Sequence, residues 1–64
     1  MTIEKTGTYR DLRLSLHGTT LRLRYSQQGA WVLRWDGGSI ISKHDSRAFA
    51  VRKAKELLRE LARP

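Results

Sequence analysis

The sequence predicts an α+β domain in which a three- to four-stranded antiparallel meander packs on one C-terminal helix (ββββα, two layers). Three observations lead to this prediction. Apolar and polar residues alternate between residues 9 and 43, which is the period of half-buried strands. Glycine-containing turns interrupt the alternation at short intervals, as hairpins require. Over residues 46–64 the apolar spacing changes to three and four, which is the period of an amphipathic helix.

The first two predicted strands are joined by a two-residue turn at residues 17–18, where glycine supplies a positive φ. This turn places Leu14 opposite Leu21, so the leucines of both strands share one face. Residues 1–8 show no periodicity, and we expect them to form a flexible arm before a single domain over residues 9–64.

The next two turns put their strands in the same register. A three-residue loop at residues 27–29, with glycine in the left-handed conformation, places the apolar residues of the third strand on the leucine face. The Asp-Gly-Gly-Ser turn at residues 36–39 leads to a short fourth strand, and either placement of the turn puts Ile40 on that face. A one-residue slip in register would turn the apolar side chains of a strand to the opposite face. The agreement of three turns on one apolar face therefore supports the meander. We therefore expect the aromatic residues of this face to lie in the core instead of stacking on bases: Tyr25, Trp31 and Trp35.

The last segment is predicted to be a helix that covers the leucine face. Ser46 or Asp45 can cap it by accepting a hydrogen bond from a free backbone N–H. Its apolar stripe consists of Ala50, Val51, Ala54, Leu57, Leu58 and Leu61. Without this helix the sheet would expose a large apolar patch.

The other face of the sheet remains uncovered and is the candidate binding surface. Arg13, Arg22 and Arg34 should form a row across three strands, and like charges in such positions cost energy unless an anion meets them. Arginine offers phosphate a planar fork of donors, and a sheet can enter the major groove of DNA. Parity assigns this face Arg13, Ser15, Thr20, Arg22, Arg24, Val32, Arg34, Ile41 and Lys43.

Composition restricts the classes of function. The chain of 64 residues carries a formal charge of +7, from 13 basic and 6 acidic residues, which favours nucleic acid, an acidic protein or an anionic membrane surface as partner. There is no cysteine, no apolar stretch of membrane-spanning length and no secretory h-region. These features favour a cytoplasmic protein. We find no motif for a nucleophile, an acid–base pair, a metal or a cofactor, so we expect no enzyme.

The segment GAWVLRWDGGSIISKHDSRAFAVRKAKELLREL resembles small bacterial domains of unknown function. These are built on Gly-x-Trp-x-Val, a glycine-rich turn, a Ser/Thr helix cap and an alanine-rich helix. The layout over residues 20–62 is also similar to the arm-type N-terminal domains of phage and transposon tyrosine integrases, and to plant GCC-box-binding domains. In both, a three-stranded sheet backed by a helix lays its open face in the major groove. By position, the resemblance implies DNA contacts for Arg22, Arg24, Arg34 and Lys43, and structural roles for Trp31 and Ser46.

The chain departs from those families in having an extra N-terminal strand and no attached catalytic domain, so recombinase activity is not implied. We predict an accessory or regulatory protein of phage or mobile-element type. It would bind nucleic acid, with double-stranded DNA favoured, through Arg13, Arg22, Arg24, Arg34 and Lys43. The alternative is a module that docks an acidic host protein through the same face. We expect a monomer or weak homodimer.

Overall fold

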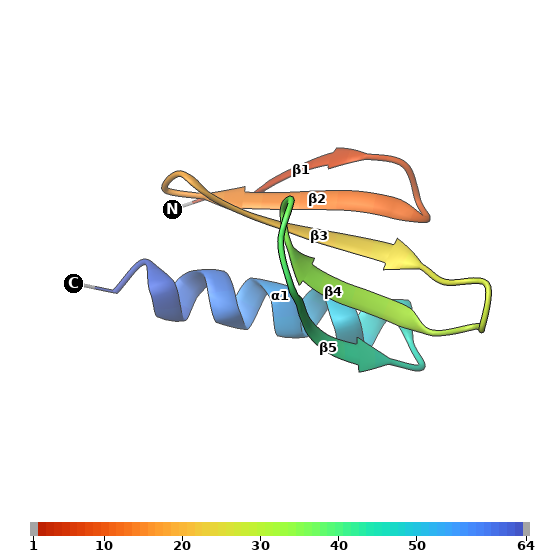
Figure 1. The fold of residues 1–64 in the computed structure, drawn as a ribbon. Helices are drawn as coiled ribbons and strands as arrows, with labels where there is room; N and C mark the ends of the chain where they lie inside the picture. Colours follow the sequence, from red (N-terminus) through yellow and green to blue (C-terminus); the bar gives the residue numbers. More distant parts are fainter. Residues whose placement is uncertain (1, 64) are drawn as a thin grey trace.

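The computed structural model describes residues 2–63, which form an open five-stranded antiparallel sheet and one C-terminal helix (Figure 1). The strands follow one another in the sheet in chain order, so the sheet is a meander. The predicted two-layer α+β class is confirmed, with one strand more than expected. The elements are β1 (Glu4–Gly7), β2 (Asp11–Leu16), β3 (Thr19–Tyr25), β4 (Trp31–Trp35), β5 (Ile40–His44) and α1 (Arg47–Leu61).

The predicted register of β2, β3 and β4 is confirmed throughout. Leu12 and Leu14 pair with Leu23 and Leu21, and Leu23 pairs in turn with Leu33. The turn between β2 and β3 has positive φ at both of its residues, 51° at His17 and 81° at the following glycine, as a type I′ turn requires. Residues 27–29 form the predicted three-residue loop, which is closed by a 2.8 Å hydrogen bond from Ser26 N to Ala30 O.

Residues 4–7, which the sequence analysis assigned to a flexible arm, form strand β1 along β2. This strand is exposed on all four residues, so its sequence carries no apolar alternation. It is held by its backbone pairing and by Ile3, which packs against the core. Gly7 allows the following turn, because it has a φ of 96° and a Cβ there would collide with the carbonyl oxygen of Asp11.

Strand β5 contains an irregularity that exchanges the faces of two isoleucines. Leu33 pairs with Ser42 but Arg34 pairs with Ile40, so Ile41 is an extra residue in the ladder. The prediction that Ile40 faces the core is therefore wrong: Ile40 lies on the open face and is 52% exposed. Ile41, expected on the open face, instead packs against the core.

Helix α1 lies across one face of the sheet, as expected, and begins at the cap that the sequence predicts (Figure 1). Ser46 Oγ accepts a 3.3 Å hydrogen bond from Phe49 N. The leucines of β2, β3 and β4 bury their side chains against Ala50, Ala54 and Leu58, whereas Leu61, expected in the apolar stripe, is half exposed.

The aromatic residues of the covered face do not all reach the core. Trp31 is buried, as predicted. Tyr25 and Trp35 have the predicted parity, because they pair with Trp31 and Leu21, but they remain 41% and 38% exposed. Both lie at the ends of their strands. The prediction that all three aromatic side chains are core residues is therefore wrong for two of them.

Candidate nucleic-acid interface

The five predicted binding residues all belong to the face of the sheet that α1 leaves open. The leucines that alternate with them pack against the helix, so their neighbours along each strand project the other way. Arg13, Arg22 and Arg34 pair directly across β2, β3 and β4, as predicted. Arg24 and Lys43 both pair with Val32, from β3 and β5.

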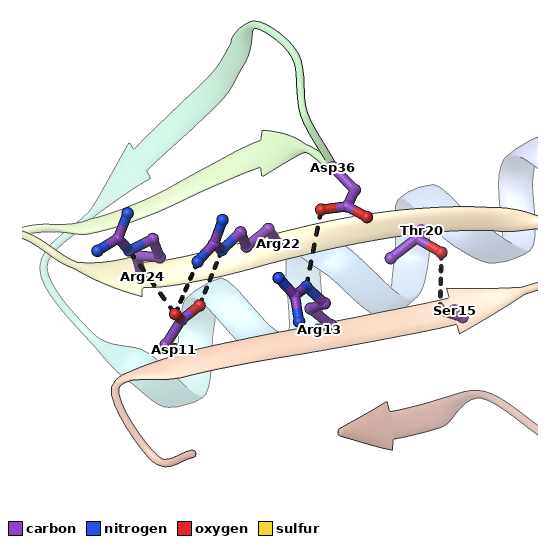
Figure 2. A network of polar contacts seen from close by, with 7 residues as sticks. All are labelled: Asp11, Arg13, Ser15, Thr20, Arg22, Arg24 and Asp36. Carbon is purple, nitrogen blue, oxygen red and sulfur yellow. Dashed lines mark hydrogen bonds and ion pairs between the residues drawn. The ribbon is translucent and has the colours of Figure 1, made fainter. Parts of the chain in front are cut away.

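The Arg22 guanidinium forms an ion pair with a carboxylate of the same sheet, as Figure 2 shows. Its Nε and Nη2 atoms donate hydrogen bonds of 2.9 and 2.8 Å to the two oxygens of Asp11. These hydrogen bonds lower the pKa of the Asp11 carboxyl and raise the pKa of Arg22. Arg24 is the residue that pairs with Asp11 across the ladder. The fork of hydrogen bonds comes instead from Arg22, the diagonal neighbour of Asp11, because long side chains reach diagonal positions.

Arg13 also has a carboxylate nearby, and it comes from the turn before β5. Asp36 N donates a 3.2 Å hydrogen bond to Thr20 O, which extends the β3–β4 pairing by one residue and puts the Asp36 side chain on the open face. Arg13 Nε then lies 3.7 Å from Asp36 Oδ1, across β3 (Figure 2). The row Arg13–Arg22–Arg34 is therefore partly neutralised within the protein.

The remaining three cations have weaker carboxylate partners or none. Arg24 Nε lies 4.0 Å from Asp11 Oδ2, at the outer limit of an ion pair. Within residues 2–63, Arg34 and Lys43 have no carboxylate oxygen within 4.0 Å. Arg34 Nε is also shielded from solvent without a hydrogen-bond partner in this part of the chain, which is a costly state for a charged group.

Arg24 and Arg34 line a shallow hollow of about 310 Å³ on the open face, and Lys43 pairs with Val32 of the same hollow from β5. Val32 and Ile40 contribute apolar surface to it, and Arg24 and Arg34 contribute charge. We call the residues Arg24, Val32, Arg34, Ile40 and Lys43 the β3–β5 patch. The hollow extends to the β3–β4 loop and is lined by Arg24, Tyr25, Ser26, Gln27, Val32, Arg34 and Ile40.

Sequence reasoning identified the cations of the patch but missed four residues of the hollow: Tyr25, Ser26, Gln27 and Ile40. Ile40 was missed because the irregularity in β5 has no signal in the alternation of Ile40 and Ile41. Ser26 and Gln27 lie after the end of β3, in the β3–β4 connection. Strand alternation assigns side chains to a face only within a strand, so it could not place these two residues.

The open face offers charge and apolar contact. Within residues 2–63, no group of three histidine or acidic side chains could hold a metal ion, and no helix is long and apolar enough to cross a membrane. Comparison with protein-family models, with curated proteins and with solved structures found no match. Any functional proposal therefore depends on the chemistry of the surfaces described above.

Proposed function

We propose that this protein binds nucleic acid, with double-stranded DNA as the preferred form, through the open face of its sheet. The observation that carries the proposal is the β3–β5 patch. Arg24 and Arg34 line its apolar-floored hollow, Lys43 lies next to it on β5, and within residues 2–63 none of the three has a carboxylate oxygen closer than 4.0 Å. A phosphate or a base edge would give these donors the acceptors that the sheet lacks. An accessory or regulatory role is the corresponding biological proposal.

The width of the sheet suggests how it would meet a duplex. Neighbouring strands lie about 4.8 Å apart, so five strands span roughly 19 Å between the outer strands. The major groove of B-DNA is only about 12 Å wide and admits a two-stranded ribbon. We infer that β3 and β4 enter the groove, with Arg24, Val32 and Arg34 facing base edges. Arg13 and Lys43, one strand further out on either side, would then reach the phosphates.

One observation favours the alternative of an acidic protein partner. Ile40 lies beside Arg34 in the ladder and exposes half of its surface. An exposed aliphatic side chain among cations also suits a protein interface, whose centre is apolar and whose rim is polar. The test below therefore includes an acidic peptide.

The direct test is an NMR titration of the protein with a random duplex of about 12 base pairs, at about 50 and 200 mM salt. We expect amide shifts to change in β3, β4 and β5 more than in α1. Affinity should fall steeply between the two salt concentrations, because each neutralised phosphate releases a counterion. A glutamate-rich peptide of equal charge serves as the competitor.

The matched variants are Arg34→Gln and Arg59→Gln, which each remove one positive charge. Arg59 is exposed on α1, the element that covers the opposite face. Arg34→Gln should weaken duplex binding by roughly tenfold, and Arg59→Gln by about twofold or less. Equal losses would mean that only net charge matters and would contradict a localised interface. Stronger binding of the peptide than of the duplex would favour the protein partner.

A further inference from the structure

A second basic surface lies at the end of the molecule where α1 begins, on the helix side of the sheet. Tyr9 and Arg10 precede β2, Tyr25 ends β3 and Trp31 begins β4, while Arg47 is the first residue of the helix. These segments are far apart in the chain, and the fold brings them together. We call these five residues the tyrosine platform.

Buried Trp31 supports both tyrosines of the platform. The Tyr9 ring meets the Trp31 ring edge-on, with centroids 5.8 Å apart and an interplanar angle of 82°. The Tyr25 ring lies 5.0 Å from Trp31 at an angle of 57°. Such contacts hold aromatic side chains in defined orientations. Both tyrosines are therefore positioned by the core, yet Tyr9 is 65% exposed and Tyr25 is 41% exposed.

An arginine guanidinium also lies over the ring of each tyrosine. The Arg47 guanidinium lies 4.2 Å from the Tyr9 ring centroid and donates a 3.1 Å hydrogen bond to the Tyr9 carbonyl oxygen. The Arg10 guanidinium lies 5.3 Å from the Tyr25 ring centroid. Within residues 2–63 neither arginine has a carboxylate oxygen within 4.0 Å. Two partly exposed tyrosines, each with an arginine over its ring, thus lie together on the platform.

The charge here is unfavourable for the helix itself. Arg47 stands in the first turn of α1, which contains no acidic residue, and a cation there opposes the positive end of the helix macrodipole. Asp45, the acidic residue closest in sequence, is exposed and forms no ion pair within the described residues. A bound anion would relieve this repulsion, because it would face both the helix start and the two arginines.

We propose that the tyrosine platform binds single-stranded nucleic acid. Two neighbouring bases would stack on Tyr9 and Tyr25, and the connecting phosphates would lie against Arg47 and Arg10. Aromatic rings next to cations suit the bases and phosphates of a single strand, and this recognition tolerates any sequence. Duplex DNA keeps its bases stacked inside and cannot use these rings. The inference does not rest on the duplex proposal, because no platform residue belongs to the β3–β5 patch, although Tyr25 also lines the hollow beside it.

The test measures binding of an oligothymidylate of about eight nucleotides by fluorescence anisotropy. A Trp35→Phe background leaves Trp31 as the one tryptophan, and its emission reports on the platform because it touches both tyrosines. In this background we expect the oligonucleotide to quench Trp31. Tyr9→Leu/Tyr25→Leu should weaken binding at least about tenfold, because each lost stack removes a base contact. Tyr9→Phe/Tyr25→Phe keeps both rings and should bind normally.

Phe49→Leu is the matched control, because Phe49 is another exposed aromatic residue flanked by cations, Arg52 and Lys53. It should bind single strands as the unmodified protein does. Circular dichroism verifies folding, and if the double leucine variant is unfolded, Tyr9→Leu and Arg10→Gln provide the same test singly. Unchanged affinity in folded leucine variants, or no quenching of Trp31, would overturn the proposal. Blunt duplex binding is measured separately, so failure at the β3–β5 patch is distinguishable from failure here.

Discussion

The cations on the two halves of the open sheet face differ in whether a carboxylate lies beside them. On β2 and the adjoining side of β3, Arg13 and Arg22 each have a carboxylate, from Asp36 and Asp11. On β4 and β5, Arg34 and Lys43 have none within the described residues. The cations of one face thus divide into charges that carboxylates of the fold compensate and charges that have no carboxylate partner within residues 2–63. Position on an open face is therefore not enough to assign a binding role.

The largest expected effect comes from comparing two double variants that each remove two positive charges from the open face. Arg24→Gln/Arg34→Gln should weaken duplex binding on the order of a hundredfold, because both side chains belong to the β3–β5 patch. Arg13→Gln/Arg22→Gln should weaken duplex binding several-fold at most, since these guanidinium groups already pair with the carboxylates of Asp36 and Asp11. Fluorescence anisotropy at fixed salt measures both. Equal losses would show that the internal ion pairs do not matter for binding.

Asp11→Asn should make the arginines beside Asp11 available for binding DNA. The change leaves Arg22 without its bidentate acceptor and removes the carboxylate 4.0 Å from Arg24. We expect duplex affinity to rise several-fold at low salt and the rise to shrink at high salt, because screening weakens exposed charges. Asp45→Asn removes an equal charge outside the sheet face and is the control. Lower affinity in Asp11→Asn would mean that the pair positions Arg22 for binding.

The ion pair between Asp11 and Arg22 should also make stability depend on pH. Hydrogen bonds from Arg22 hold the pKa of Asp11 below its ordinary value of 3.8. The pair therefore contributes fully at pH values above 3.8, and its contribution disappears as the pH falls through the folded-state pKa. The Tm of the unmodified protein should exceed that of Asp11→Asn by a small constant amount between about pH 5 and pH 8, and the difference should vanish in acid. A difference independent of pH would contradict this assignment.

The smallest expected effect concerns the apolar floor of the patch. Ile40→Thr should leave the melting temperature nearly unchanged, because Ile40 is half exposed and threonine also favours strands. Duplex affinity should fall by about twofold, since charged contacts dominate DNA binding. Ile41→Thr, one residue further along, should instead lower stability, because Ile41 packs against the core. A large loss of duplex affinity from Ile40→Thr would contradict the expectation that charged contacts dominate.

Much of the sheet could be predicted because strand parity is a local property of the chain. The alternation of Leu12, Leu14 and Leu16 with polar residues, and the glycine turns, determined which face of β2, β3 and β4 would be buried. The same parity placed Arg13, Arg22 and Arg34 in one row. The helix and its Ser46 cap followed from spacing and capping chemistry. Strand β1 was missed because backbone pairing alone, without an apolar face, leaves no pattern.

By itself, then, the sequence determined the meander, the helix and the face on which each strand's cations lie, since neighbouring residues on a pleated backbone must point to opposite sides. Only the tertiary structure decided which cations have partners. Asp11 reaches Arg22 along a diagonal, and Asp36 reaches Arg13 across an intervening strand. It also decided that Tyr25 remains exposed, at the end of its strand. Such outcomes depend on sheet twist, strand irregularities and side-chain reach, which bring together residues that the linear pattern keeps apart.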